Sequence, residues 1–314
     1  MKLLNLKEQN TSSSLPKILV VLGPTASGKS DLAVKLALQR NGEVISADSR
    51  QVYKGLDIGS GKITKEEMKG VPHHLLDACS PHKVFTASDY ARLALKAINN
   101  ILSRGKLPII CGGTGFYIDA ALYKNSFAPI KSNTVIRQKL NALTTDKLAQ
   151  KLAKLDPERF VNIDKHNRPR LIRSLEIILS TGKPVPKLKK IALYNVEKIG
   201  ILWPLKELDK RIELRLDQRL SPITGGMINE VTNLKFPKKG KGLSSQRLHD
   251  LGLEYRYVSL FLDGKVDYKT MHANLLTASK QYARRQITWF KRDKEIQWIA
   301  PRKRESKKEG LTLL

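Results

Sequence analysis

Apolar and polar positions alternate in blocks along the first part of the chain. Short apolar runs occur at residues 18–22, 43–46, 74–76 and 107–111. Stretches with apolar residues at helical spacing lie at 30–39 and 88–103. Such an alternation of buried strands and amphipathic helices is typical of a parallel sheet covered by helices on both faces. We therefore predict an α/β fold, with Ser88 as the N-cap of its helix.

The pattern changes in the middle of the chain. Residues 124–190 contain helical segments and no convincing strand, and the stretch at 140–155 is lysine-rich and amphipathic. Another helix is expected to begin at Pro169, which suits a first helical position, and to end before Gly182. Further on, we predict a strand at 199–203 and helices at 208–220 and 271–292. The simplest organisation is a helical insertion domain (122–197) inside one α/β core (1–121 and 198–314), with a charged tail from Pro301 that we expect to be disordered.

The charge of the chain is far from balanced. Lysine and arginine number 57 against 29 acidic residues, which gives a formal net charge of +28 in 314 residues. A field of this sign attracts polyanions over long distances and makes their binding depend on salt. Solubility alone does not require one sign to be so heavily favoured. We therefore expect a nucleic-acid partner for a chain whose apolar content, 41%, is that of an ordinary globular protein.

The remaining composition argues against several classes of protein. Cys79 and Cys111 have neither C-x-x-C spacing nor histidines at zinc-finger distance. Cys111 ends an apolar run and is interpreted as a small core residue. No apolar run approaches the length of a membrane span, and the first residues lack the apolar region of a signal peptide. We expect a reduced, cytoplasmic protein that has no membrane partner and acts as a monomer.

A glycine-containing motif carries the most specific chemistry. Residues 23–30 read GPTASGKS, which fits the P-loop pattern G-x-x-x-x-G-K-[ST], between an apolar strand and an amphipathic helix. Its backbone N–H groups and the positive end of the helix would bind phosphate. Lys29 would neutralise phosphate charge, and the Ser30 hydroxyl would bind Mg²⁺. An ordinary turn is the alternative, and the motif, typical of nucleotide- and ATP-binding proteins, indicates phosphate without naming a reaction. The expected phosphate site comprises Gly23, Pro24, Thr25, Ala26, Ser27, Gly28, Lys29 and Ser30.

Two further segments follow strands that neighbour the P-loop strand. Asp48 comes just after the strand at 43–46, where ligands collect in open α/β sheets, although an aspartate that only caps its turn is the alternative. Thr114 lies in the glycine-rich turn after the strand at 107–111, and its hydroxyl could approach the same ligand. That strand does not end in Asp or Glu, so the usual Walker-B carboxylate is missing there. This disfavours a nucleotide-hydrolysing motor and leaves a small-molecule kinase open.

Two predicted helices carry arginines on one face. Arg170 and Arg173 lie three residues apart near the start of one helix, and Arg284 lies on a basic stripe of the helix at 271–292. A solvated face is the usual explanation of such stripes. In a chain this basic, we favour contacts with phosphate backbones. Gln286 is expected either to face solvent or to read a base edge.

Seven segments together resemble the tRNA dimethylallyltransferases, the family of isopentenyl transferases that act on tRNA. The segments are GPTASGKS, ISADSRQVYKGLDIGSGK (45–62), PHHLLD (72–77), GGTGFY (112–117), RPRLIRSLEI (168–177), TGKP and QYARRQITWFKR (281–292). They occur in the family's order and span most of the chain. The resemblance implies a P-loop NTPase-like parallel sheet flanked by helices, with a helical insertion domain, which agrees with the organisation predicted above.

The resemblance also implies a reaction. In this family the P-loop and Mg²⁺ bind dimethylallyl diphosphate, and N6 of the adenosine 3′-adjacent to the anticodon of tRNA attacks the allylic carbon. By this resemblance Asp48 would accept the proton, and Lys29 would stabilise the departing diphosphate. Thr114 would position the leaving oxygen or the base, and Arg211 would match a family arginine near the diphosphate. The adenine would have to flip out of its stack.

The family's contacts with the anticodon stem-loop are carried over residue by residue. They fall on Asp48, Ser49, Arg50, Gln51, Thr114, Pro169, Arg170, Leu171, Ile172, Arg173, Tyr255 and Arg256, to which the basic stripe adds Arg284. The chain departs from the family pattern at Glu254, where bacterial members have glycine. If that glycine has a positive φ, a glutamate would strain the backbone there. The Cys/His zinc finger of eukaryotic relatives is missing, which indicates a bacterial-type enzyme.

Three other functions stay open at this point. An isopentenyltransferase acting on free adenine nucleotide would need neither the insertion nor the charge. A P-loop small-molecule kinase would require ATP turnover. A non-catalytic RNA-binding module would explain the charge but leave GPTASGKS and Asp48 without a role.

Overall fold

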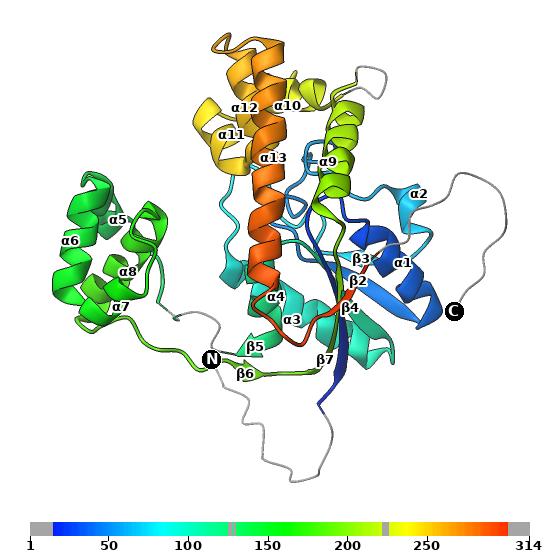
Figure 1. The fold of residues 1–314 in the computed structure, drawn as a ribbon, viewed down its shortest axis with the longest axis horizontal. Coiled ribbons are helices and arrows are strands. Elements are labelled where there is room, and N and C mark those ends of the chain that lie inside the picture. Colours follow the sequence, from blue (N-terminus) through cyan, green and yellow to red (C-terminus); the bar gives the residue numbers. More distant parts are fainter. Residues whose placement is uncertain (1–14, 125–127, 129, 222–225, 301–314) are drawn as a thin grey trace. The chain divides into compact units, whose positions relative to one another are not determined.

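A computed structural model of the chain describes residues 15–124, 128, 130–221 and 226–300. It divides into two compact units. The core unit combines Met1–Leu122 with Leu193–Leu314, and the insertion unit is Tyr123–Ala192 (Figure 1). The predicted boundary at 197 falls inside the core unit, because its sheet already contains Asn195–Ile201. The charged tail from Pro301 lies outside the described residues.

A parallel sheet of six strands lies at the centre of the core unit. Its strands are β1 (Lys17–Leu22), β2 (Gly42–Ser46), β3 (His73–His74), β4 (Leu107–Gly112), β7 (Asn195–Ile201) and β8 (Gln297–Ile299). They are ordered β3-β2-β4-β1-β7-β8, and every neighbouring pair is parallel. The side chains from Ile18 to Val21 in β1 are 0% exposed, as in a strand covered on both faces. The predicted parallel α/β sheet is therefore confirmed.

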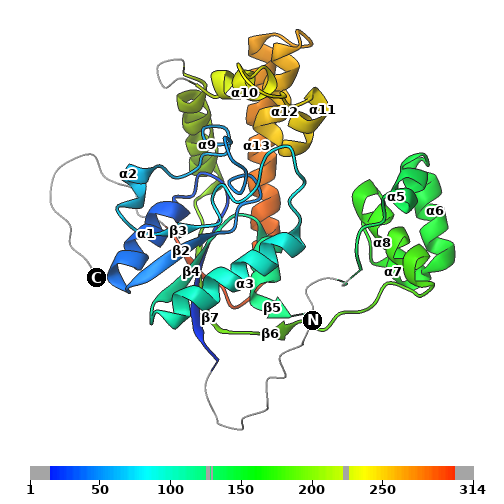
Figure 2. The same cartoon turned by 180° about the vertical axis from the view of Figure 1, so that it is seen from behind.

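Helices surround this sheet (Figures 1 and 2). They are α1 (Lys29–Gln39), α2 (Lys65–Met68), α3 (Ala87–Ser103), α4 (Gly115–Leu122), α9 (Leu205–Leu220), α10 (Met227–Lys235), α11 (Ser245–Leu251), α12 (Leu253–Leu262) and α13 (Tyr268–Phe290). Ala33 and Val34 of α1 pack on Leu19 and Val21 of β1. α9 and α13 lie side by side near the P-loop, and α12 packs on α13. None of the helices in the described ranges is both long and apolar enough to cross a membrane.

Local hydrogen bonds correct several predicted boundaries. Thr86, not Ser88, caps α3, because its hydroxyl accepts the N–H of Asp89 at 3.2 Å while the Asp89 carboxylate accepts the N–H of Thr86 at 3.1 Å. The strand predicted at 74–76 stops at His74, since Leu75 has a φ of 64°. Strand β7 starts four residues before the predicted 199 and ends at Ile201.

The insertion unit contains helices α5 (Thr134–Asn141), α6 (Thr145–Leu155), α7 (Pro157–Val161) and α8 (Arg168–Thr181). Its short strands β5 (Tyr123–Lys124) and β6 (Ile191–Ala192) pair antiparallel and were not predicted. Thr144 caps α6, so the stretch predicted as one helix at 140–155 is interrupted. Leucines from α6 and α8, including Leu148 and Leu171, form a separate apolar core. The unit therefore has its own core, distinct from that of the sheet.

A buried carboxylate holds this small core together. The Glu176 side chain is 0% exposed, and it accepts hydrogen bonds from Arg137 Nε at 2.8 Å, Arg173 Nη1 at 2.6 Å and the N–H of Asn133 at 2.7 Å. Burial alone would raise the pKa of Glu176, but these donors outweigh it and lower the pKa to about 2. Glu176 therefore ties α5 to α8 as an anion.

We predict that Glu176→Gln destabilises the insertion unit by about 2–3 kcal/mol at neutral pH, since two guanidinium groups lose their counter-charge. The lowered pKa gives stability that is complete above the unfolded-state pKa of about 4.3 and lost as the pH falls toward 2. Amide hydrogen exchange in α5 and α8, compared between the variants at pH 7 and near pH 3, measures both effects. Glu158→Gln is the control, because the Glu158–Lys187 pair is 64% and 80% exposed. Equal protection in wild type and Glu176→Gln would contradict the prediction.

Candidate active site

The P-loop lies between β1 and α1 at the carboxyl end of the sheet. Gly28, directly before α1, has a φ of 87°, a left-handed conformation that side chains disfavour. The Lys29 amine donates to the carbonyl of Pro24 at 3.2 Å and so folds back over the loop. Burial is the main cause of its lowered pKa, opposed by the charge of Asp48. An amine in such surroundings gains from an anionic ligand that replaces its lost hydration.

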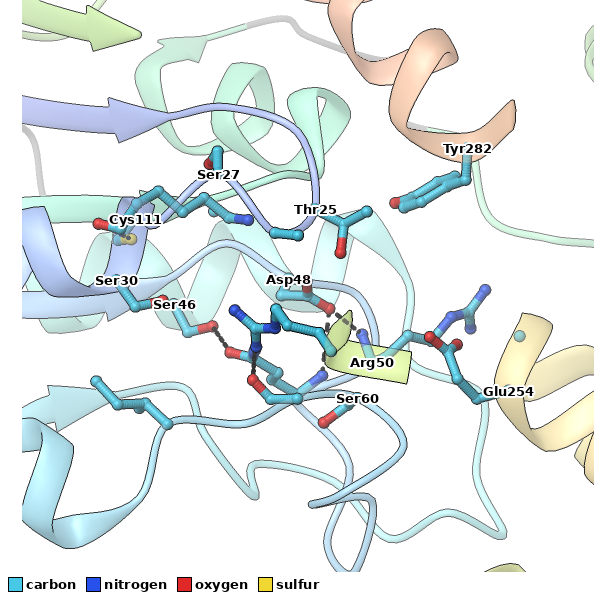
Figure 3. Close-up of a pocket in the computed structure, with 18 of the residues that line it drawn as sticks. Thr25, Ser27, Ser30, Ser46, Asp48, Arg50, Ser60, Cys111, Glu254 and Tyr282 are labelled. Carbon is cyan, nitrogen blue, oxygen red and sulfur yellow. Dashed lines mark hydrogen bonds between the residues drawn. The ribbon is translucent and has the colours of Figure 1, made fainter. Parts of the chain in front are cut away.

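The loop forms one wall of a cavity of about 280 Å³ within the core unit (Figure 3). Its other walls come from the segment after β2, from α9, from the start of α12 and from α13. Thr25, Lys29, Ser30, Asp48, Arg50, Gln51, Arg215, Arg219, Glu254, Arg256, Ser279, Tyr282 and Gln286 all line it. In Figure 3 Thr25, Asp48 and Tyr282 converge from three different elements. Segments far apart in the chain therefore meet at the P-loop.

Helix α9 adds cations to this cavity. Arg215 lies against the loop after β2, where a Cβ on Gly61 would come within 3.2 Å of Arg215 Nη2. Burial, followed by repulsion from Arg219, lowers the pKa of Arg215. Arg211 instead donates from Nε to the carbonyl of Ala26 at 2.8 Å and stacks on the Trp203 ring at 4.6 Å. Arg211 thus holds the P-loop backbone through Nε, whereas Arg215 lines the cavity directly, so the geometry favours Arg215 as a cation that meets a ligand.

The charges of this group have no internal counterpart. Within the described ranges, no carboxylate forms an ion pair with Lys29, Arg211 or Arg215, whereas Arg219 pairs with Glu254 at 3.3 Å. Lys29 and Arg211 are partly buried and Arg215 is exposed, and cations gathered without ion-pair partners are stabilised by a ligand that supplies the opposite charge. Together with the N-terminus of α1, they make this end of the cavity a site for a polyanionic group such as diphosphate.

Asp48 lies in the same cavity. Its Oδ1 accepts the N–H of Arg50 at 2.8 Å and that of Gln51 at 3.4 Å, so the carboxylate caps its own turn. Its Oδ2 has no hydrogen-bond partner among the described residues, while the side chain lines the cavity. The two alternatives considered for Asp48 are therefore compatible. One oxygen fixes the carboxylate, and the other is available to accept a proton from a bound nucleophile.

Thr114 lies behind this surface. Its Oγ1 accepts the N–H of Ser49 at 3.1 Å. Burial, reinforced by the charge of Asp48, raises the pKa of Tyr282 to about 12. Neither Thr114 nor Ser49 lines the cavity. In this conformation Thr114 holds the turn at Ser49, and Tyr282 is a neutral hydroxyl in the cavity that Asp48 also lines.

Gln286 joins the P-loop to the turn after β4. Its Oε1 accepts the N–H of Thr25 at 2.9 Å, and its Nε2 donates to the carbonyl of Gly113 at 2.8 Å. Gly113 permits this approach, since a Cβ there would lie 2.3 Å from Nε2. The expectation that Gln286 faces solvent or reads a base is wrong, because the residue is 6% exposed with both amide atoms engaged. The spacing of Ser279, Tyr282 and Gln286 was the signal for a shared inward face.

Comparisons with known proteins agree with this geometry. The family model described as IPP transferase matches residues 51–293. The tRNA dimethylallyltransferase of Anoxybacillus flavithermus is 40% identical over 90% of both chains, and that of Pelotomaculum thermopropionicum is 36% identical over the same shares. The chain belongs to the IPP transferase family.

Solved structures of IPP transferases resemble the chain as well. The tRNA isopentenylpyrophosphate transferase of Bacillus halodurans shares 37% identity with a TM-score of 0.65, covering 91% of this chain and 90% of that one. A eukaryotic dimethylallyltransferase, described as acting on tRNA, shares 25% identity with a TM-score of 0.77, covering 91% of this chain and 74% of that one. The family resemblance of the seven motifs and the predicted P-loop NTPase-like fold are confirmed.

The RNA contacts carried over from the IPP transferase family fall into exposed and buried groups. Pro169 and Arg170 are exposed at the start of α8. Leu171 and Ile172 are 0% and 9% exposed, and their side chains pack in the core of the insertion unit, so the RNA contacts carried over onto them stay predictions. Arg173 is engaged with Glu176 and with the carbonyl of Ile130.

Contacts predicted elsewhere divide similarly. Tyr255 is 0% exposed and donates to Glu230 at 3.0 Å, so its RNA contact stays a prediction, whereas its neighbour Arg256 lines the cavity. Arg284 pairs with Asp209 at 2.8 Å on the side of α13 facing α9, so its charge is already compensated. Of the arginines predicted to contact RNA, Arg50, Arg170 and Arg256 form no ion pair with a carboxylate in the described ranges, and Arg50 donates to the backbone carbonyl of Asp250 at 3.3 Å.

Glu254 does not strain the backbone. It lies in the first turn of α12, and Gly252, not Glu254, has the positive φ, 131°. The condition for the expected backbone strain, a positive φ at position 254, is therefore not met. Glu254 Oε1 lies 3.3 Å from Arg219 Nη1, and Arg219 also donates to the carbonyl of Gly59 at 2.6 Å. The chain thus accommodates a glutamate, in place of the glycine of the family pattern, through an ion pair with Arg219 in the cavity wall.

The residues present suit Mg²⁺ held jointly with a ligand. No group of three or more His, Cys, Asp or Glu that could hold a metal occurs in the described ranges. Mg²⁺ usually keeps several waters and binds through one or two protein ligands and substrate phosphates. The Ser30 hydroxyl lines the cavity at the P-loop and would be one such protein ligand.

We predict that Asp48→Asn lowers the rate of transfer by about a hundredfold or more, because the amide keeps the turn-capping oxygen but cannot accept a proton. Single-turnover transfer and the melting temperature are the measurements. Asp48→Ala is the comparison, since it also removes the cap and should lower the melting temperature. A turnover close to wild type in Asp48→Asn would exclude Asp48 as the base.

We predict that Arg215→Ala weakens diphosphate binding by about tenfold or more, as expected for the loss of a charge-assisted hydrogen bond. Calorimetric titration with inorganic diphosphate measures it. Lys210→Ala removes the same charge from the same helix at a side chain that is 75% exposed, and should leave the affinity unchanged. Equal losses in both variants would indicate a nonspecific effect of net charge.

Proposed function

We propose that the protein transfers a dimethylallyl group from dimethylallyl diphosphate to N6 of the adenosine 3′-adjacent to the anticodon of tRNA. The observation that carries the proposal is the meeting, in one cavity, of a P-loop with unpaired cations and a carboxylate with a free oxygen. The first part binds and stabilises a leaving diphosphate, and the second accepts a proton. The similar proteins of Anoxybacillus flavithermus and Pelotomaculum thermopropionicum are named tRNA dimethylallyltransferases, which supports the proposal.

The reaction divides between the two parts of the cavity. The P-loop amides, Lys29 and Arg215 hold the diphosphate and stabilise the charge it gains when the C–O bond breaks. The new bond joins the allylic carbon to N6 of the adenine, and the displaced proton goes to Asp48 Oδ2. Mg²⁺, held through Ser30 and the diphosphate, would supply further neutralisation of that charge. Tyr282, neutral at physiological pH, presents a polar edge beside Asp48.

Binding of tRNA would draw on charge spread over both units. The net charge of +28 provides long-range attraction, and Arg170 at the exposed start of α8 supplies a specific phosphate contact. The target adenine must leave its stack to reach Asp48. As a tRNA-modifying enzyme the protein would act in the cytoplasm, and we expect it to work as a monomer.

A small-molecule kinase is the second candidate, because the P-loop alone would serve ATP. Strand β4 ends at Gly112 without an acidic residue, so the Walker-B contribution to metal binding is missing there. An acceptor of free adenine nucleotide would leave the insertion unit without a role. Both candidates are less well supported than transfer to tRNA.

Incubation with labelled dimethylallyl diphosphate separates these functions. We expect label in unmodified tRNA and none in AMP, with Mg²⁺ required both for transfer and for tight binding of inorganic diphosphate. Label in AMP alone would establish the free-nucleotide acceptor. Phosphoryl transfer from ATP without label transfer would establish a kinase.

We predict that Arg170→Ala lowers the slope of log affinity for tRNA against log salt by about one unit, since one phosphate contact is lost. Filter binding of unmodified tRNA over a salt series measures the slope. Arg170→Lys keeps the charge and should keep the slope, and diphosphate affinity should not change in either variant. An unchanged slope in Arg170→Ala would show that Arg170 is a solvated surface residue that makes no phosphate contact.

A further inference from the structure

One hydroxyl in the cavity has no role in the mechanism above. Ser279 lies on α13, lines the cavity and is 6% exposed, yet its Oγ has no hydrogen-bond partner among the described residues. A helical serine or threonine usually satisfies its hydroxyl by donating to the carbonyl four residues earlier. Thr288 on the same helix does so, with the Arg284 carbonyl at 3.0 Å. Ser279 is therefore a buried polar group left open toward the cavity, and such groups need an explanation.

Its position follows from the pairing of α13 with α9. The ion pairs Asp209–Arg284 at 2.8 Å and Glu213–Lys280 at 3.3 Å show that the two helices run antiparallel. Ala283 packs with Ile212 in the same apolar cluster. One turn back along α13 is Ser279, and about one turn forward along α9 is Arg215. The Ser279 hydroxyl is thus placed at the level of Arg215 in the cavity wall.

The surroundings decide which ligand group the hydroxyl meets. Lys29, Arg215 and the P-loop form the anion-binding end of the cavity, and Asp48, which lines the same cavity, is assigned to the adenine by the proposed reaction. A hydroxyl that lines the same cavity as Arg215, whose guanidinium forms no ion pair in the described ranges, would donate to an anionic oxygen held there. Resting on the proposed function, we propose that Ser279 is a further substrate-binding residue whose hydroxyl donates to a diphosphate oxygen, on the side that the P-loop leaves open.

The proposal predicts opposite effects on binding and on stability. Ser279→Ala should weaken binding of inorganic diphosphate by about tenfold, the loss expected for a hydrogen bond to a charged group. It should leave the melting temperature of the free protein unchanged or raised, because it removes an unsatisfied buried hydroxyl. Ser279→Thr keeps the hydroxyl and should restore the affinity. A purely structural serine would lower stability instead.

Ser259 provides the matched control. It is also a buried helical serine, 3% exposed on α12, but its Oγ accepts from Lys235 Nζ at 3.5 Å and it does not line the cavity. Ser259→Ala should lower the melting temperature and leave diphosphate affinity unchanged. Comparison of Ser259→Ala with Ser279→Ala therefore distinguishes the loss of a hydrogen-bonded hydroxyl from the loss of a hydroxyl without a partner in the described residues.

The experiment is calorimetric titration of the full chain with inorganic diphosphate and Mg²⁺, followed by steady-state transfer. An unchanged diphosphate affinity in Ser279→Ala overturns the proposal. So does a rise of the tRNA KM alone, which would assign the hydroxyl to the adenosine. The proposal is also overturned if each Ser279 variant that loses diphosphate affinity has a lower melting temperature as well, because the serine would then be structural.

Failure of the proposed function can be distinguished from failure of the Ser279 contact, because the diphosphate titration contains no tRNA. Wild-type protein that binds diphosphate without transferring the label to tRNA would refute the function, and the Ser279 variants would still decide the contact. Wild-type protein that binds no diphosphate would overturn both.

Discussion

The amide of Gln286 holds the cavity together. It accepts from Thr25 in the P-loop and donates to Gly113 after β4, so one side chain links three segments that lie up to 261 residues apart in the sequence. The same helix then presents Tyr282 and Ser279 to the cavity, and its ion pairs with α9 fix where Arg215 stands. Without this bridge the P-loop would bind phosphate with nothing to define the space above it.

Buried charged residues of the fold such as Glu43 and Lys198 have ion-pair partners, whereas Lys29 and Arg215 of the cavity have none in the described residues. Glu43 is 1% exposed, and a hydrogen bond from Arg104, with further ones from Lys106 and His74, holds its pKa well below the usual range. Lys198 is likewise buried and paired with Asp293 and Glu295, each at 2.7 Å. Such fully paired ions belong to the fold. Lys29 and Arg215 form no such pair among the residues that the structure describes, and in the proposed reaction the diphosphate would supply the opposite charge.

The sequence allowed the parts of the site that depend on local pattern to be predicted. The P-loop and Asp48 follow apolar strands, and their positions at the carboxyl ends of those strands come directly from the parallel sheet. Arg215, Gln286 and Ser279 could not be found in this way, because their roles arise from the packing of α9 and α13 against a loop that lies far away in the chain. Leu171 and Ile172, to which the resemblance assigns RNA contacts, pack in the core of the insertion unit. A motif transferred residue by residue includes core positions that keep a helix in place without touching a ligand.

The sheet order has a consequence for how the chain is made. Strand β1 lies between β4 and β7, and the insertion unit, Tyr123–Ala192, is synthesised between those two neighbours. The insertion unit has its own apolar core and contacts that are local in sequence, so it can fold as soon as it leaves the ribosome. The P-loop strand must wait for β7, and the cavity above it for α13, which ends at Phe290. During synthesis β1 is therefore an unpaired apolar edge for most of the chain's length, exposed to misassociation while its last partner is still being translated.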